Sequence, residues 1–225
     1  MSSLLPHYTH IINPRLKHTY LSFDDEGGLV IKSPAVSQAY IETLLIKKAS
    51  WIRRSQERFA RKKGRTGDLV QGATLFFLGK AYPLELYPSR TKRTLFRFEE
   101  THFVLKHTDD ASHLMQKHID RFYKEEAQKY IPPLVEKWSA RMGVTPTGIR
   151  FRKTKRQWGS CSSKNSLSFN TMLMKLPLEA IEYVVVHELA HIVHKHHQKA
   201  FWDLVVHYLP DYRERQQIVR EYSPT

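Results

Sequence analysis

Hydrophobic and polar residues alternate over short stretches in the first half of the chain, a pattern typical of strands with one buried face. The alternation predicts a hairpin over residues 19–23 and 29–32, around the acidic and glycine-rich turn 24–28. From 36 to 61 the apolar residues recur every three or four positions, which predicts a helix. After a turn-rich stretch, we predict four further strands at 73–78, 83–87, 95–98 and 102–107.

Helical periodicity dominates the second half. A long helix is predicted over 111–142, with a kink or break at Pro132-Pro133, because proline lacks the N–H that a helix interior uses. Strands near 149–154 and 167–170 precede a helix over 177–195, whose apolar residues surround most of its axis and mark it as buried. Two shorter helices are predicted over 198–208 and 211–222.

This order of elements indicates an α+β fold. We expect a β-rich amino-terminal region with one long helix over 1–108, followed by a domain over 109–225. In that second domain, a small sheet and covering helices would surround the buried helix. With 225 residues, 41% of them hydrophobic, the chain can bury a substantial core.

The buried helix carries the motif H-E-x-x-H as His187-Glu188-Leu189-Ala190-His191. Residues four apart lie on one face of a helix, so His187 and His191 can direct two imidazoles at one ion. A carboxylate and two imidazoles are costly in apolar surroundings unless they are paired or coordinated. The motif therefore predicts a zinc site with two histidine ligands and Glu188 as general base.

A catalytic zinc usually takes a third protein ligand. His197 is favoured, because it follows His191 by six residues and the chain can turn back after the helix ends. The metzincin pattern has this spacing, although His194 stands where that pattern has glycine. His194 itself lies too far along a straight helix to share the ion. It remains an alternative, together with His196 and Glu214.

The chain resembles a known family over most of its length. The residues that carry the resemblance are 48–52, 79–84, 152–163, 167–170 and 183–191, followed by His197 with Phe201-Trp202. Together they resemble the YgjP-like metal-dependent hydrolases, which are small zincin-type proteins distantly related to the SprT and WLM groups. One departure is Gln157, where the family would have arginine.

The resemblance implies a minimal zincin-like core with three histidine ligands, His187, His191 and His197, and Glu188 as catalytic carboxylate. Zinc lowers the pKa of a bound water, and the carboxylate accepts the water proton. Peptide-bond hydrolysis is the usual outcome, so we expect a zinc metallopeptidase. The alternative is hydrolysis of a non-peptide substrate such as a nucleotide phosphoanhydride.

The segment Trp158-Gly159-Ser160-Cys161-Ser162-Ser163 is expected to form a compact turn of small residues beside the catalytic helix. Its hydroxyl and backbone N–H groups suit substrate binding, so Trp158, Ser160 and Asn170 are candidate substrate-binding residues. A purely structural turn around a packed tryptophan is an equal alternative. Cys161 is the one cysteine, and nothing in the sequence orients a base toward it, which disfavours a cysteine nucleophile.

Basic residues outnumber acidic ones by 36 to 22, which gives a net charge of +14 and suggests nucleic acid as a partner. Nine Lys or Arg and one acid lie between Lys47 and Arg65. Further groups lie at 90–97 and from Arg150 to Arg156. These charges are either a phosphate-binding surface or a solvated one. A nucleic-acid-binding protein with a non-catalytic zinc is thus a second alternative.

Localisation signals are absent from the start of the sequence. Residues 1–20 contain no apolar core of signal-peptide length, and no run of residues reaches the length of a transmembrane helix. A single cysteine excludes an internal disulfide and agrees with a reducing compartment. We therefore expect a cytoplasmic protein that does not enter a membrane.

Overall fold

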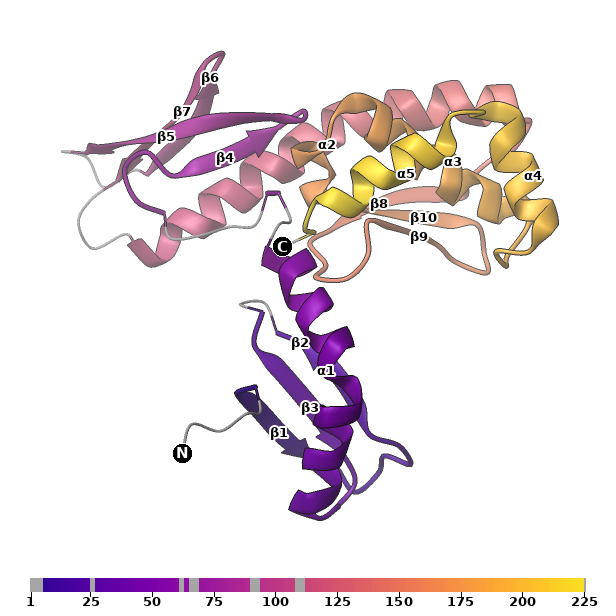
Figure 1. Cartoon of the computed structure of the whole chain (residues 1–225). Coiled ribbons are helices and arrows are strands. Elements are labelled where there is room, and N and C mark those ends of the chain that lie inside the picture. The colour runs from indigo at the N-terminus through magenta and orange to yellow at the C-terminus, as the bar shows by residue number, and fades with distance from the viewer. Residues whose placement is uncertain are drawn as a thin grey trace. The chain divides into compact units, whose positions relative to one another are not determined.

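The observed elements confirm the predicted α+β class (Figure 1). The computed structural model describes residues 6–24, 27–60, 63–64, 69–89, 94–107 and 112–224. Within them lie three small β-sheets, five α-helices and one 3-10 helix. The chain divides into two compact units, 1–62 and 63–225, each with its own hydrophobic core.

The first unit is a three-stranded sheet with one helix. Its elements are β1 (Tyr8–Ile12), β2 (Tyr20–Phe23), β3 (Leu29–Ser33) and α1 (Gln38–Ala60). The strand order is β1-β3-β2, in which β2 is antiparallel to β3 and β1 is parallel to it. The predicted hairpin and helix are confirmed. The sequence does not predict β1, because this largely exposed edge strand shows no apolar alternation.

A four-stranded sheet opens the second unit. It consists of β4 (Thr74–Phe77), β5 (Lys80–Pro88), β6 (Leu95–Glu99) and β7 (His102–His107), in the order β4-β5-β7-β6. All four predicted strands are therefore present. The sheet shares one hydrophobic core with the helices that follow, through Phe103, Tyr123 and Val185 among others. The predicted domain division at residue 108 remains a prediction.

The helix α2 (Ser112–Met142) continues through Pro132 and Pro133, so the helix is not broken there, and the alternative of a kink remains a prediction. Packing explains the continuity, because Ile131 is fully buried and Val135 and Trp138 are 3% and 2% exposed. Burial of these side chains on both sides of the proline pair offsets the lost backbone hydrogen bonds.

The second sheet of this unit supports the candidate site. It consists of β8 (Gly148–Arg152), β9 (Gly159–Cys161) and β10 (Ser166–Asn170), in the order β8-β10-β9. The strands β8 and β10 are as predicted, but β9 replaces part of the turn expected at 158–163. It pairs antiparallel with β10, with Ser160 opposite Ser168. The short 3-10 helix η2 (Thr171–Lys175) follows β10.

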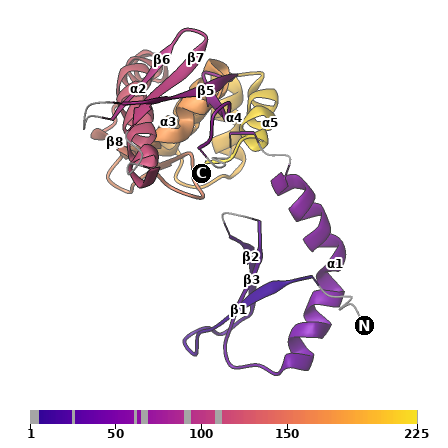
Figure 2. The same cartoon turned by 90° about the vertical axis from the view of Figure 1, so that its left-hand side faces the viewer.

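The motif helix α3 (Leu178–Val193) lies between α2 and the last two helices, α4 (Lys199–Tyr208) and α5 (Tyr212–Glu221) (Figure 2). Its side chains Ile181, Val185, Val186, Leu189 and Ala190 are fully buried, which confirms the predicted central helix. With 16 residues it is shorter than the 20 or so that a bilayer requires. No described helix is long and apolar enough to cross a membrane.

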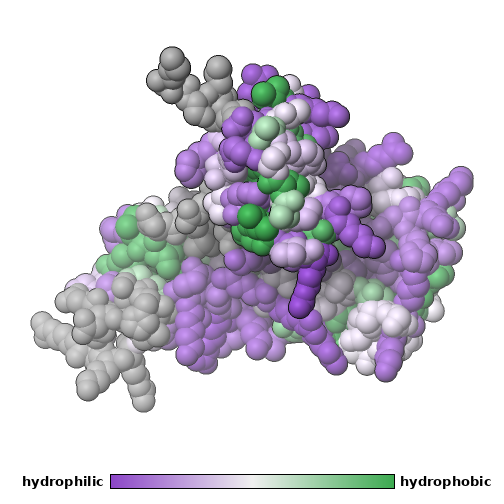
Figure 3. Space-filling view, turned by 90° about the horizontal axis from the view of Figure 1, so that it is seen from below, coloured by the Kyte–Doolittle hydropathy of each residue, from purple (hydrophilic) through white to green (hydrophobic). Residues whose placement is uncertain are grey.

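Hydrophilic side chains predominate on the face shown in Figure 3, and the apolar residues there form small separate patches. Several large apolar side chains are nevertheless exposed in the first unit. The most exposed are Ile12, Tyr20, Tyr40 and Ile46.

Candidate metal centre

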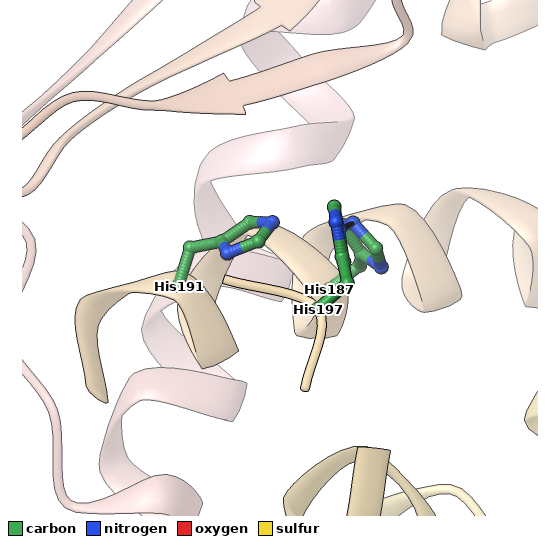
Figure 4. A group of neighbouring side chains, drawn as sticks. All are labelled: His187, His191 and His197. Atoms are coloured by element: carbon green, nitrogen blue, oxygen red, sulfur yellow. Dashed lines mark hydrogen bonds between the residues drawn. The ribbon is translucent and has the colours of Figure 1, made fainter. Parts of the chain in front are cut away.

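Three histidines from two neighbouring segments converge in the second unit. His187 and His191 lie one turn apart on α3, and His197 lies on the segment that follows (Figure 4). One ring nitrogen from each lies within 4.8 Å of the others, and the Nε2 atoms of His187 and His197 are 3.0 Å apart. Nitrogens that share a tetrahedral zinc are about 3.4 Å apart. The donor set therefore fits a divalent metal ion.

The return of His197 requires the helix to end two residues earlier than predicted. His194 caps α3 with φ −124° and ψ 104°, and its N–H donates to the carbonyl of Ala190 at 2.9 Å. Because this conformation is extended, the turn needs no residue with positive φ. That explains how the chain makes the turn without the glycine of the metzincin pattern.

His194 contributes its backbone to the cluster. Its carbonyl oxygen lies 3.0 Å from Nδ1 of His191, so Nδ1 carries the proton and donates it. This hydrogen bond leaves Nε2 of His191 with a free lone pair. A backbone acceptor of this kind orients a metal-binding imidazole and fixes its tautomer.

His187 has a corresponding partner on the preceding turn of α3. Its Nδ1 lies 3.5 Å from the hydroxyl of Tyr183, and that hydroxyl accepts a hydrogen bond from Nε2 of Gln216 at 2.9 Å. The phenyl ring of Phe201 is fully buried beneath the cluster, with its centroid 4.6 to 5.0 Å from all three imidazoles. The site thus has an apolar floor and a polar network on one side.

This environment keeps the imidazoles of His187 and His191 neutral. Burial, with added repulsion from His191 and His197, lowers the pKa of His187 to about 3. Burial also lowers the pKa of His191. Neutral imidazole is the form that coordinates metals, so two of the three rings are in their binding form at neutral pH.

Glu188 lies among buried groups on the same helix. It is 5% exposed, and burial raises its pKa to about 8. Its Oε2 atom is buried and has no hydrogen-bond partner among the described residues. A buried carboxyl oxygen without a partner is costly in a purely structural role and suits a group that meets a cation, a water or a substrate.

The position of Glu188 depends on a glycine in β9. A Cβ atom at Gly159 would lie 2.6 Å from both Cγ and Oε1 of Glu188, so only glycine allows this approach. The sequence alone does not predict this contact, because the contact arises from the packing of α3 against β9. Tyr183 and Gln216 were likewise missed, although Tyr183 precedes His187 by one turn.

A cavity of about 240 Å³ opens beside His187 and Glu188. Trp158, Val184 and Val219 are among its apolar lining residues, and two glutamines also contribute. No lysine or arginine is among the described residues that line it. The cavity is therefore largely uncharged except for the catalytic candidates themselves.

The predicted substrate-binding residues occupy different places. Trp158 lines the cavity, whereas Ser160 is exposed on β9 outside it. The Asn170 amide donates to the carbonyls of Thr154 and Gln157 at 2.7 and 2.9 Å, and its Oδ1 accepts from the N–H of Met172. These bonds hold the loop before β9. Substrate binding by these residues remains a prediction.

Two of the alternatives for the third ligand, His196 and Glu214, are not members of the histidine cluster. Among the described residues, the group able to hold a metal contains neither His196 nor Glu214, both of which are exposed. Cys161 is half-buried, and burial raises the pKa of its thiol. A raised pKa reduces the thiolate fraction, which disfavours a cysteine nucleophile.

Two solved structures are similar to part of this chain. A crystal structure of the metallopeptidase zymogen of Pyrococcus abyssi abylysin matches at 22% identity and a TM-score of 0.36, over 39% of this chain and 89% of that one. The metallopeptidase zymogen of Methanocaldococcus jannaschii jannalysin matches at 21% identity and 0.36, over 40% and 92%.

A curated relative, the UTP pyrophosphatase of Escherichia coli strain K12, is 33% identical over 67 residues. That alignment spans 30% of this chain and 40% of the relative. A family model described as "YgjP-like, metallopeptidase domain" matches residues 17–222. Because this match covers most of the sequence and includes the whole histidine cluster, the chain belongs to the YgjP-like family.

Proposed function

We propose that the protein is a zinc-dependent peptidase, with His187, His191 and His197 as the metal ligands and Glu188 as the general base. The observation that carries the proposal is the convergence of three histidines within 4.8 Å next to a buried carboxyl. Three histidine donors with a carboxyl group alongside are typical of catalytic zinc sites, which keep a fourth position open. The metallopeptidase description of the family supports the same reaction.

When bound, zinc would acidify a water molecule and polarise the carbonyl of the substrate. Glu188 then takes the proton of the attacking water and transfers it to the nitrogen that leaves. The buried Oε2 of Glu188 has no hydrogen-bond partner among the described residues, so this oxygen can both accept and return a proton. Gly159 contributes by giving the carboxyl room to lie against β9.

The cavity beside the site supports a peptide substrate. Its volume of about 240 Å³ is below the range of pockets that enclose a whole drug-sized ligand. It suits a single side chain of a substrate whose backbone crosses the metal. The lining by Trp158, Val184 and Val219 favours an apolar side chain at that position.

Hydrolysis of a nucleotide phosphoanhydride is the second candidate, and the similarity to the UTP pyrophosphatase of Escherichia coli supports it. A triphosphate is usually held by arginine or lysine side chains. Because the described lining of the cavity contains neither, we rank this substrate after peptides. A non-catalytic zinc ranks third, since structural sites normally have four protein ligands and are rich in cysteine.

The test uses the full chain, stripped of metal and then loaded with zinc. We expect it to cleave an unfolded protein such as casein, and we expect Glu188→Gln to abolish cleavage while binding the same amount of zinc. Glu179→Gln, an exposed carboxyl on the first turn of the same helix, is the matched control and should remain active.

Three results would change the assignment. Full activity of Glu188→Gln would remove the general base from the proposal. Release of pyrophosphate from UTP without any peptide cleavage would replace the first candidate by the second. Failure of the wild-type chain to take up zinc would overturn both.

A further inference from the structure

One face of α1 presents aromatic and cationic side chains in alternation. Tyr40, Lys47, Trp51 and Arg54 are separated by seven, four and three positions, so they form one stripe along the helix. We call these four residues the α1 stripe. All four are exposed, including Tyr40 at 47% and Trp51 at 39%.

The opposite face of α1 is buried within the first unit. Ile41 and Leu45 are fully buried and Ile52 is 2% exposed, in a core shared with Leu29 and Ile31 of β3. This packing holds α1 on its sheet and leaves the α1 stripe exposed. The apolar face of the helix is therefore unavailable to any other partner.

The indole of Trp51 is positioned by its own unit. Its ring centroid lies 5.8 Å from that of Phe23 on β2, with the two planes inclined at 36°. The contact restrains the indole while a large part of it remains exposed. An aromatic ring held on the surface in this way loses little side-chain entropy when another ring stacks on it.

Four cations of α1 lack the ion pairs with described residues that eight cations of the second unit form. Lys47, Lys48, Arg53 and Arg54 are exposed and form no ion pair with a described residue. In the second unit, ion pairs are formed by Lys63, Arg97, Arg121, Lys129, Lys137, Lys153, Lys199 and Arg215. The unpaired positive charge on α1 is thus available to an external anion.

We propose that the α1 stripe binds single-stranded nucleic acid, with Lys47 and Arg54 on phosphates and with Tyr40 and Trp51 stacked on bases. Cations along the backbone combined with aromatic stacking platforms are the usual means of binding single strands. From Tyr40 to Arg54 the helix rises about 21 Å, a length that covers several consecutive nucleotides. A duplex would contact the cations but would keep its bases away from the rings.

Two other anionic partners fit the stripe less well. A membrane-surface helix needs a continuous apolar face, and that face of α1 is already buried. An acidic peptide would satisfy the cations and leave the exposed rings unused. The predicted basic stretch 150–156 carries less of the proposal, because Lys153 in it is paired with Asp120 at 2.7 Å. Arg65, Arg90, Lys92 and Arg93 lie outside the described residues.

The test measures fluorescence anisotropy of a labelled 20-mer of thymidine against the full chain, over a series of salt concentrations. We expect binding that weakens as salt rises. Lys47→Glu with Arg54→Glu should weaken binding at least tenfold and reduce the salt slope by about 1.4, for two lost phosphate contacts on a single strand. Trp51→Ala should weaken it roughly 5- to 150-fold, whereas Trp51→Phe should retain most of it.

Lys106→Glu with Lys124→Glu provides the matched control, because it makes the same change of charge at two exposed lysines of the second unit. Circular dichroism checks that every variant is folded. If the stripe variant and this control weaken binding equally, the charge acts non-specifically and the proposal is wrong. Tighter binding to vesicles of phosphatidylserine than to the oligonucleotide would assign the face to a membrane instead.

Discussion

The two compact units of this protein differ in how they use charge. In the second unit many cations are paired with carboxylates, and the cavity beside the histidines is lined without lysine or arginine. In the first unit Lys47, Lys48, Arg53 and Arg54 of α1 are exposed, form no ion pair with a described residue, and lie on the same helix as the exposed rings of Tyr40 and Trp51. A net charge of +14 therefore says little about the substrate, because no lysine or arginine is among the described residues that line the cavity.

If the second unit holds the metal and the first unit binds nucleic acid, a change at the metal centre should leave nucleic-acid binding intact. His191→Ala removes one of three ligands, and we expect metal affinity to fall by more than about a thousandfold, since a three-ligand site depends on each donor. Titration of the metal-free chain with Co²⁺, followed by its absorption spectrum, measures the loss. Binding of the thymidine 20-mer should be unchanged.

His194→Ala is the control for that change, because His194 contributes its carbonyl oxygen rather than its ring. The variant should keep most of its Co²⁺ affinity. Equal losses in the two variants would show that the ring of His194 is a ligand. A parallel loss of oligonucleotide binding in His191→Ala would end the division of tasks between the units.

A buried lysine sharpens the contrast with the exposed cations of α1. Lys175 is 3% exposed, donates to the carbonyl of Gly64 at 2.5 Å, and has a pKa lowered by burial to about 7. The folded state therefore binds fewer protons than the unfolded state between pH 7 and about 10.5. The free energy of unfolding should rise with pH across that window, by roughly 2 kcal/mol from pH 7 to 9.

Urea denaturation at pH 6.5, 8 and 9.5 tests this linkage. Lys175→Met should lose the pH dependence that Lys175 causes. The free energy of unfolding of the wild type, relative to that of the variant, should therefore rise as the pH rises. Lys47→Met, at an exposed lysine of α1, should follow the wild-type pH dependence. If the free energy of unfolding changes with pH in the same way in the wild type and in Lys175→Met, then Lys175 titrates normally.

A third prediction concerns the shape of the catalytic site. Gly159→Ala places a methyl group 2.6 Å from Glu188 Cγ and should cost about 1–3 kcal/mol of stability or displace the carboxyl. We expect a large loss of peptidase activity with the zinc content unchanged. Gly148→Ala is the control, since a Cβ there meets nothing within 4 Å. Normal activity of Gly159→Ala would mean that Glu188 needs no such clearance.

Features that depend on residues close together in the sequence were predictable. The helix over 178–193 and the facing pair His187 and His191 were predictable, because helical spacing alone places residues four apart together. His197 was favoured by its spacing from the motif, and the structure brings it into the cluster.

Features that depend on distant partners were missed or wrong. The strand β9 has three residues and exists through its pairing with β10, and the clearance at Gly159 arises where α3 packs on β9. The unbroken α2 depends on burial around its prolines. In each case tertiary packing overrides the local preference of the sequence.

The smallest effect is expected at the polar network beside the metal centre. This network consists of the hydroxyl group of Tyr183 and the amide group of Gln216. Tyr183→Phe removes the hydroxyl that lies 3.5 Å from Nδ1 of His187 and that accepts from Gln216. Outer partners of metal-binding histidines typically change metal affinity 10- to 100-fold. Because this hydrogen bond is long, we expect a loss near tenfold.

Competition for Zn²⁺ with a chromophoric chelator measures that change directly, without reference to turnover. Tyr212→Phe, a tyrosine on α5 whose hydroxyl accepts a hydrogen bond from Arg213, is the matched control and should bind zinc as the wild type does. If Tyr183→Phe binds zinc with unchanged affinity, the ring of His187 is oriented by its packing on Phe201 and Trp202, whose centroids lie 5.0 and 6.0 Å away. The hydrogen-bonded side chains of Tyr183 and Gln216 would then contribute to the cavity rather than to metal binding.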